Sequence, residues 1–465
     1  MTDTVEIRTP DNPLRVAIVG SGPSGFYAAE ELLQCGRSVE VSMLERLPVP
    51  FGLVRSGVAP DHPKLKQPIV VYDRIASSDS FRYFGNVHFG SDVTLSDLNQ
   101  MYHAVILACG SQSERRLGVP GEDLPGSHAG TDFVGWYNGH PAHAGHRFDL
   151  SQEAVVIVGQ GNVALDITRM LAKSADELRH TDIAQHALEA LAQSRVRDIH
   201  IVGRRGPAQA KFTPSELMEL GKIPGCDIVV NEAELALNEA SVLEAGDRMS
   251  RNISSNLGIF RKFAAGTRTP QGRRCHFHFF LNPVGIEGAD RVERVRFERT
   301  RLEGEPFKQA ARPTGDFTNI ECELVFRSIG YKGTPLPGVP FDEARAVVPN
   351  RAGRVADPDG GSAGNIYVTG WMKRGPTGII GTNKADSMET VATLLADLAR
   401  FPQQPKLGGD ALARHLEARG HAYVDYADWK KIDAYEISRG MSAGKPREKL
   451  VVQRSMLEVA GKASA

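Results

Sequence analysis

Short apolar runs alternate with amphipathic segments along most of the chain. Residues 15–20 (RVAIVG) have the pattern of a buried strand, and the segment after them predicts a helix with Phe26, Ala29, Leu32 and Leu33 on one face. Further apolar runs predict buried strands at 103–110, 154–159, 198–203, 322–330 and 365–371. Strands that alternate with helices in this way indicate an α/β fold.

A glycine-rich turn joins the first predicted strand to its helix. Gly20, Gly22 and Gly25 form the pattern Gly-x-Gly-x-x-Gly. In dinucleotide-binding turns such glycines permit a tight turn, close approach of backbone to pyrophosphate and close helix-to-strand packing, while N–H groups at the helix start bind phosphate. A glycine triad alone also serves plain packing. Here the next predicted strand ends at Glu45, where an acid accepts hydrogen bonds from a ribose, so the full pattern predicts a dinucleotide site.

The same pattern occurs a second time farther along the chain. Gly159, Gly161 and Ala164 follow another apolar strand, and the strand after that ends at Arg204 and Arg205 in place of an acid. Two guanidinium groups can bind the 2′-phosphate of NADPH through paired hydrogen bonds. Arginines in a loop often only face water, but their position after the second strand favours NADPH over NADH.

Size and composition fit a protein with two such sites. The 465 residues allow two or three domains, and 41% hydrophobic with 24% charged residues are typical of a globular chain. A net charge of -1 offers no general attraction to nucleic acid. No apolar run reaches the about 18 residues of a membrane span, and the first residues resemble neither a secretory signal nor a transit peptide. We therefore expect a cytoplasmic protein without membrane insertion or nucleic-acid binding.

The number and spacing of the cysteines argue against several kinds of site. There are five of them, and they are scattered with no Cys-x-x-Cys pair: Cys35, Cys109, Cys226, Cys275 and Cys322. This pattern argues against a disulfide scaffold, a zinc ribbon, a bound iron-sulfur cluster and a thioredoxin-reductase-like redox pair. We expect no metal site.

The order of the motifs predicts one domain inserted in another. We predict two Rossmann-like, three-layer dinucleotide-binding domains. An FAD-binding domain comprises residues 1–112 and 332–402, and an NADP-binding domain comprises residues 113–331. Residues 403–465 form a C-terminal helical extension in which we recognise no chemistry.

Longer stretches resemble the adrenodoxin reductase branch of the ferredoxin-NADP reductases, which are flavoproteins of the glutathione reductase superfamily. The matching stretches lie at 47–66, 130–141, 159–166, 202–217 and 370–384. The strand before the last predicted helix ends in Gly370-Trp371, as in this branch, whereas most related flavoproteins have Gly-Asp there. The resemblance implies an enzyme whose FAD takes hydride from NADPH and passes single electrons to a ferredoxin- or adrenodoxin-like iron-sulfur protein, reversibly in principle.

The resemblance also implies cofactor contacts at specific positions. For FAD these are the glycine turn and a set of later residues: Gly20, Gly22, Ser24, Gly25, Glu45, Leu53, Phe89, Trp371, Gly378, Ile379 and Ile380. For NADP they are Arg115, Gln160, Gly161, Asn162, Val163, Arg204, Arg205, Glu216 and again Gly378. Gly378 is expected to touch both cofactors where nicotinamide stacks on flavin, and the start of the helix after it could favour the reduced, anionic flavin.

Two further matches are candidates for tuning hydride transfer. His62 and Glu219 occupy family positions near nicotinamide and flavin. Each also has a plain alternative interpretation. His62 stands between Asp61 and Pro63 in a turn where it could cap backbone groups, and Glu219 could be a solvated residue of an amphipathic helix.

The expected partner is an acidic ferredoxin or similar carrier that binds transiently. Arg251, Arg261 and Lys262 lie in a segment that loosely resembles the docking region of the family, although charged residues are usually just solvated. Two other functions use the same glycine motifs. One is an electron-transfer module of an amidotransferase-like complex, which would bring cysteine-rich segments that are absent here, and the other is a redox sensor that binds FAD and NADPH without passing electrons on.

Overall fold

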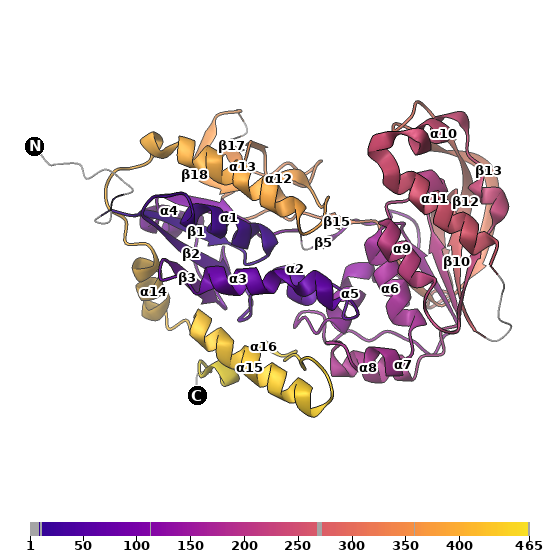
Figure 1. Cartoon of the computed structure of the whole chain (residues 1–465), viewed down its shortest axis with the longest axis horizontal. Coiled ribbons are helices and arrows are strands. Elements are labelled where there is room, and N and C mark those ends of the chain that lie inside the picture. Colours follow the sequence, from indigo (N-terminus) through magenta and orange to yellow (C-terminus); the bar gives the residue numbers. More distant parts are fainter. Residues whose placement is uncertain (1–8, 10–11, 112, 267–271, 358, 464–465) are drawn as a thin grey trace, which may run out of the picture. The chain divides into compact units, whose positions relative to one another are not determined.

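The computed structural model describes residues 9, 12–111, 113–266, 272–357 and 359–463. The chain forms two compact units, which we call unit 1 (Met1–Ser113 and Tyr331–Ala465) and unit 2 (Glu114–Gly330) (Figure 1). The two connecting segments pair as a short sheet of β5 (Ser113–Glu114) and β15 (Tyr331–Lys332). Among the described residues, none of the helices combines the length and apolar character that crossing a bilayer requires.

Unit 1 is built on a seven-stranded sheet. Its strands, in spatial order, are β16 (Asn350–Arg351), β17 (Arg354–Ala356), β18 (Ser362–Val368), β4 (Ala104–Leu107), β1 (Leu14–Val19), β2 (Val39–Glu45) and β3 (Phe81–Gly85). The five strands from β18 to β3 run parallel, while β16 and β17 form an antiparallel edge. Parallel strands place their carboxyl ends along one edge of a sheet, where α/β proteins bind ligands.

Both faces of this sheet are buried, so unit 1 has three layers. On β1, Leu14, Val16 and Ile18 join one apolar cluster, and Ala17 and Val19 join another on the opposite face. The first cluster includes side chains of α1 (Pro23–Leu33), α3 (Pro68–Ala76), α13 (Thr382–Ala396), α15 (Tyr426–Ser442) and α16 (Gln453–Ala460). The second includes side chains of α4 (Leu95–Met101), α12 (Trp371–Arg374) and α14 (Gly409–Ala418).

The C-terminal helices are integral to unit 1. Trp429 of α15 is 1% exposed, and its ring lies edge-on to Phe51 with centroids 5.7 Å apart. Glu436 of the same helix is fully buried and pairs with Arg55 of α2 (Gly52–Ser56). Residues after 402 thus pack on the segment that follows β2.

Unit 2 combines a parallel and an antiparallel sheet. The parallel sheet has the order β6 (Ser127–Ala129), β14 (Leu324–Arg327), β7 (Ala154–Val158), β8 (Asp198–Val202), β10 (Arg273–His278) and β9 (Cys226–Val230). The antiparallel sheet consists of β11 (Leu281–Glu287), β12 (Arg294–Glu303) and β13 (Ala310–Glu321).

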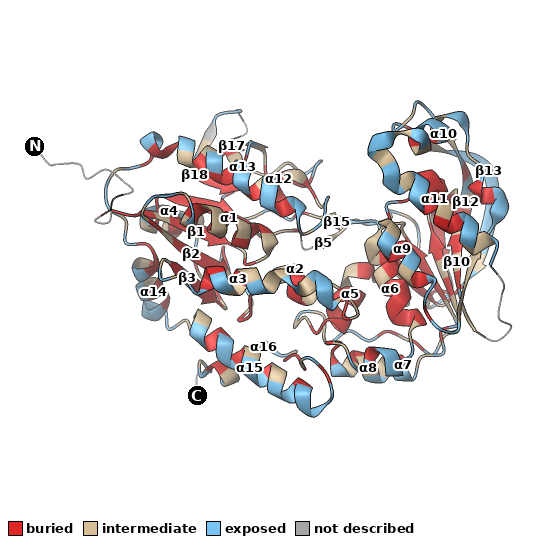
Figure 2. Ribbon diagram, viewed as in Figure 1, coloured by how far each residue is buried: buried red, intermediate tan, exposed pale blue. Residues whose placement is uncertain are grey.

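Helices cover one face of the parallel sheet in unit 2, and the antiparallel sheet packs on the other. The helical layer consists of α5 (Gly130–Tyr137), α6 (Asn162–Ala172), α7 (Ala175–Leu178), α8 (Gln185–Ala192), α9 (Pro214–Leu220) and α11 (Arg251–Ala264), with α10 (Glu239–Gly246) beside α11. On the other face, Val156 and Val158 of β7 meet Val295 and Phe297 of β12. Figure 2 shows the parallel strands buried and the outer sides of the helices exposed. The predicted α/β, three-layer architecture is confirmed.

Candidate functional site

The first glycine turn links β1 to α1 and depends on its glycines. Gly20 has a φ of +110°, and a Cβ there would lie 2.5 Å from the carbonyl oxygen of Ala108. A Cβ on Gly25 would lie 2.1 Å from the oxygen of Gly20, so α1 could not approach β1. Space around Gly22 is open, and no side chain caps α1. Free N–H groups at this helix start, beside open space, fit a pyrophosphate.

Glu45 is held beside this turn at the end of β2. Its carboxylate accepts hydrogen bonds from the backbone N–H and the hydroxyl of Ser21, at 3.1 and 2.6 Å. The backbone N–H of Leu47 donates a third hydrogen bond at 3.1 Å. The acid is thereby fixed at the position where a ribose hydroxyl could donate to it.

The segment after β2 approaches the same turn. The backbone N–H of Phe51 donates to the oxygen of Ser21 at 3.1 Å. A Cβ on Gly52 would lie 2.9 Å from the Cα of Gly22, so only glycine permits this approach. Leu53, the second residue of α2, has 38% of its surface exposed. Sequence reasoning included Leu53 but missed Phe51.

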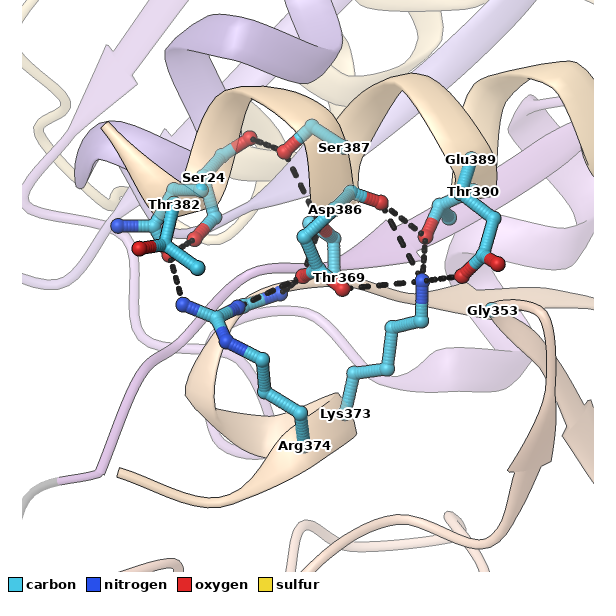
Figure 3. Close-up of polar contacts among 12 residues, drawn as sticks. Ser24, Gly353, Thr369, Lys373, Arg374, Thr382, Asp386, Ser387, Glu389 and Thr390 are labelled. Carbon is cyan, nitrogen blue, oxygen red and sulfur yellow. Dashed lines mark hydrogen bonds and ion pairs between the residues drawn. The ribbon is translucent and has the colours of Figure 1, made fainter. Parts of the chain in front are cut away.

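The turn between β18 and α12 is anchored to α13 by Asp386. The carboxylate of Asp386 accepts hydrogen bonds from the N–H of Gly370 at 2.5 Å and from Arg374 at 2.8 Å (Figure 3). Lys373 lies 3.0 Å from the same carboxylate and 2.6 Å from Glu389. These contacts fix the position of the predicted flavin contact Trp371, the first residue of α12. Sequence reasoning missed Asp386, because its partners lie 12 to 17 residues earlier.

The same turn is tied to the first glycine turn. A Cβ on Gly370 would lie 2.2 Å from the hydroxyl oxygen of Ser24. Ser24 Oγ also lies 3.0 Å from Asn383 Oδ1, and Ser387 donates to the backbone oxygen of Ser24 at 2.9 Å (Figure 3). The structure thus brings together three segments that the sequence prediction assigned to FAD: the glycine turn, the Gly370 turn and the start of α13.

The turn before α13 contains the predicted contacts at 378–380. Gly378 has a φ of +86°, and a Cβ there would lie 2.8 Å from Thr382. Ile379 is 67% exposed, and its N–H donates to the hydroxyl of Thr382 at 3.2 Å. Ile380 is half-buried against the apolar cluster of unit 1 that includes side chains of α1. Phe89, by contrast, is buried in the cluster on the opposite face of the sheet.

The second glycine turn, between β7 and α6, repeats the first. Gly159 has a φ of +142°, and a Cβ there would lie 2.1 Å from the oxygen of Ser328. Gly161 has open space around it, no side chain caps α6, and Ala164 is fully buried. This turn therefore also offers N–H groups to a pyrophosphate.

The residues around this turn are held by hydrogen bonds within unit 2. The side-chain amide of Gln160 donates to the backbone oxygen of His278 at 3.0 Å. The side-chain oxygen of Asn162 accepts from the N–H of Thr213 at 2.9 Å. Val163 packs against the apolar cluster between the parallel sheet and the helices of unit 2. Of the predicted NADP contacts here, Gly161 and the helix start offer free backbone groups, while the side chains of Gln160 and Asn162 brace the turn.

Arg204 and Arg205 follow β8, as predicted. Neither forms an ion pair with a carboxylate in the described part of the chain, and burial together with the neighbouring Arg204 lowers the pKa of Arg205. Their backbone oxygens accept hydrogen bonds from Thr300 Oγ1 at 2.7 Å and from the N–H of Phe280 at 3.1 Å. A cavity of about 280 Å³ adjoins the turn at Gly206. Two adjacent cations without acidic partners fit a phosphate group.

Glu216 and Arg115 lie elsewhere in unit 2. The Glu216 carboxylate is buried on α9 and lies 2.8 Å from Arg169 Nη1, which also pairs with Asp166 at 2.5 Å. Arg115 is exposed, and its N–H donates to the oxygen of Gly330 at 3.0 Å. Glu216 therefore neutralises a buried arginine, a role that the sequence did not indicate.

The two candidates for tuning hydride transfer lie in different units. His62 belongs to unit 1 and precedes the 3₁₀ helix Pro63–Lys66, but its side chain does not cap that helix. Glu219 belongs to unit 2 and is half-buried on α9. The side chain of His62 therefore does not cap the helix that follows it, and the parts of His62 and Glu219 in hydride transfer stay predictions.

The basic segment at 251–262 is helical. Arg251, Arg261 and Lys262 are exposed on α11, and none of them pairs with a carboxylate among the described residues. Arg251 and Lys262 are eleven residues apart, three helical turns, so they share one side of the helix.

Two cysteines that are distant in sequence meet in unit 2. Cys226 of β9 and Cys275 of β10 have sulfur atoms 3.3 Å apart and are not bonded. In unit 1, burial raises the pKa of the Cys109 thiol, which follows β4, to about 12. A thiol with such a pKa is not a nucleophile at neutral pH.

Comparisons with known proteins identify relatives of this chain. Residues 14–202 match the family model for pyridine nucleotide-disulphide oxidoreductases. The chain is 44% identical to the NADPH-ferredoxin reductase FprA of Mycobacterium leprae over 97% of its own length and 99% of the relative's. It is 42% identical to the mitochondrial NADPH:adrenodoxin oxidoreductase of Arabidopsis thaliana, covering 96% and 95%. The structure of Mycobacterium tuberculosis FprA in complex with NADPH superposes with a TM-score of 0.91 at 43% identity, covering 96% and 99%.

Proposed function

The chain belongs to the family that contains the NADPH-ferredoxin and NADPH:adrenodoxin reductases, and on that premise we propose that it is an FAD-dependent ferredoxin-NADP reductase. It oxidises NADPH and reduces an iron-sulfur carrier, reversibly in principle. FAD supplies the chemistry, because a flavin accepts a hydride and releases its two electrons singly. The observation that carries the proposal is the presence of one complete dinucleotide-binding turn in each unit.

Unit 1 binds FAD in this proposal. The N–H groups at the start of α1 bind the pyrophosphate, and Glu45 accepts a hydrogen bond from the ribose. Leu53, Trp371 and the turn at 378–380 complete the contacts, and Phe89, whose side chain is buried in the cluster on the other face of the sheet, contributes through its backbone. Gly378, with a φ of +86°, forms the turn where the nicotinamide is expected to stack on the flavin.

Unit 2 binds NADPH. Gly161 and the start of α6 bind the pyrophosphate, and Arg204 with Arg205 binds the 2′-phosphate. The remaining predicted contacts are Arg115, Gln160, Asn162, Val163 and Glu216. Glu216 acts indirectly, since it neutralises Arg169 of α6.

His62 and Glu219 are proposed to tune hydride transfer. Replacing either residue should lower the rate of flavin reduction without changing the affinity for NADPH, because neither is expected to bind phosphate. His62→Gln and Glu219→Gln keep the size and polarity of the side chains. If both variants are reduced at the rate of the unaltered protein, the two residues have no part in the reaction.

The test of the function is a stopped-flow comparison of NADPH with NADH. NADPH should bleach the yellow oxidised protein rapidly, and NADH slowly. In an Arg204→Ala, Arg205→Ala double variant the preference for NADPH should fall by on the order of a hundredfold, because charge-assisted hydrogen bonds contribute about 1.5–3 kcal/mol each. The exposed Arg195 of the same unit, changed to Ala, is a matched control. A colourless protein that takes up no flavin would refute the proposal.

The partner is proposed to be an acidic ferredoxin that docks transiently on α11. Reduction of such a carrier should fall steeply with added salt, because screening weakens steering between opposite charges. An Arg251→Glu, Lys262→Glu variant should reduce the carrier more slowly, with unchanged reduction of its own flavin by NADPH. Arg195→Glu is the control for a change of charge elsewhere. We also propose a cytoplasmic location, which cell fractionation would test.

A further inference from the structure

An unusual polar strip runs along one face of the parallel sheet in unit 2. Asp198 and His200 on β8 and Arg274, His276 and His278 on β10 point to the same face, because strand residues two apart share a face. In the register of the two strands, His276 lies opposite His200 and Arg274 opposite Asp198. Interior strands of parallel sheets are normally apolar on both faces, so three histidines at such positions require an explanation.

The three imidazole rings are arranged so that their nitrogens converge. One ring nitrogen from each of His200, His276 and His278 lies within 4.8 Å of the other two. Nδ1 of His200 and Nε2 of His278 share a hydrogen bond of 2.9 Å, so one of these nitrogens carries a proton that a bound ion would displace. Zinc bonds to imidazole of about 2.0–2.1 Å place neighbouring ligand nitrogens about 3.3 Å apart in a tetrahedral site. Modest side-chain rotations would therefore convert the cluster into a ligand set.

Carboxylates around the cluster compensate the nearby cations. Asp198 lies 2.7 Å from Nε2 of His276 and 2.6 Å from Arg274, so it both orients a histidine and neutralises an arginine. A carboxylate bonded to a ligating histidine is a common feature of zinc sites. The other nearby cation, Arg299, has a carboxylate partner in Glu234 at 3.4 Å.

A cavity provides room for an ion and a further ligand. It has a volume of about 390 Å³ and lies between the polar strip and the antiparallel sheet. Its lining includes His200, His278, Arg299 and Glu321. Glu321 or a water molecule could occupy a fourth coordination position.

We propose that His200, His276 and His278 form a binding site for a divalent transition-metal ion, with zinc as the expected ion. The site lies wholly within unit 2 and does not depend on the proposed reductase function. It revises the expectation of no metal site, which rested on the cysteine spacing alone.

A second cluster in the same unit provides a matched control. Asp132, His143 and His146 also lie close enough to share an ion, but this cluster offers two imidazoles instead of three, and His146 is exposed. A His143→Gln, His146→Gln variant removes as many imidazoles as a His276→Gln, His278→Gln variant.

The test is titration of the chelator-treated, flavin-containing protein with Zn²⁺ alone, followed by calorimetry. The unaltered protein should bind one ion per chain at micromolar concentrations. The His276→Gln, His278→Gln variant should bind on the order of a hundredfold more weakly or not at all, Asp198→Asn should bind about tenfold more weakly, and the control should bind normally. Circular dichroism confirms folding, and substitution of Co²⁺ in the unaltered protein should give the absorption of a tetrahedral site. The proposal is refuted if the unaltered protein binds no Zn²⁺. It is also refuted if binding survives the loss of His276 and His278, or if binding is lost only in the control variant.

Discussion

Replacing Glu436 with Gln should destabilise unit 1, although this residue lies in the C-terminal segment. Its carboxylate is fully buried and accepts hydrogen bonds from Arg55 at 2.9 and 2.5 Å. Arg447 donates a further hydrogen bond at 3.1 Å, and the N–H of Leu450 donates one at 2.8 Å. The substitution keeps the shape of the side chain, removes its charge and replaces one acceptor oxygen with an NH₂ donor.

The magnitude follows from the cations that would be left behind. Arg447 keeps a second partner, because Asp433 lies 2.8 Å from it. Arg55 is only 8% exposed, and apart from Glu436 its charge faces the ring of Trp429, 5.3 Å away. Removing one partner of a buried ion pair typically costs about 3–5 kcal/mol, because an uncompensated charge remains in a medium of low polarity.

The assay is urea unfolding followed by tryptophan fluorescence. With a slope of about 3 kcal/mol per molar urea, the midpoint should fall by about 1 M or more. An Arg55→Met, Glu436→Met double variant removes both charges and should lose clearly less stability than Glu436→Gln. If Glu436→Gln costs less than about 1 kcal/mol, or if the double variant is as unstable as the single one, the buried charge is not the cause.

Three further predictions concern the same unit. Burial alone would raise the pKa of Glu436, but Arg55 and Arg447 outweigh it and lower that pKa below 4.5. The difference in unfolding free energy between the unaltered protein and Glu436→Gln should therefore be complete above pH 4.5 and shrink as the pH falls below it. A difference independent of pH would contradict this. Gly378→Leu should slow flavin reduction by NADPH on the order of a hundredfold in stopped flow while flavin stays bound, because at a φ of +86° a Cβ would lie 2.8 Å from Thr382 and the side chain would displace the turn at the expected stacking position. Asp386→Asn should release flavin at a lower temperature on heating, because it weakens the anchors of Gly370 and Arg374, whereas Asp342→Asn, at an exposed turn, should not.

Features of the structure that depend on residues close together in the chain could be predicted from the sequence. Gly20, Gly25 and Gly159 lie at strand-to-helix turns where a Cβ would collide with backbone, so their spacing alone indicates the geometry. The fold class follows from these motifs and the family from the longer matching stretches, and both are confirmed. The individual cofactor contacts, the domain boundaries and the docking residues stay predictions.

Contacts between distant segments could not be predicted from local patterns. Asp386 was not identified because nothing near it in sequence signals an anchor for Gly370. Cys226 and Cys275 are 49 residues apart and meet only because β9 and β10 are neighbours. His276 and His278 alternate with buried residues, as polar residues do in any half-exposed strand, so the pattern does not indicate a cluster. They lie close to His200 only because β8 and β10 are neighbours in the sheet.

The C-terminal helices help to hold Phe51 in an unfavourable backbone conformation. Phe51 has a φ of +84°, a left-handed conformation that costs a bulky residue about 1–3 kcal/mol and persists only where its surroundings enforce it. Its ring is held between Phe26 of α1 and Trp429 of α15, with centroid distances of 5.5 and 5.7 Å. Its N–H is thereby directed to the oxygen of Ser21 in the first glycine turn. The segment after 402 therefore contributes to the shape of the proposed flavin site by packing, without supplying any group that reacts.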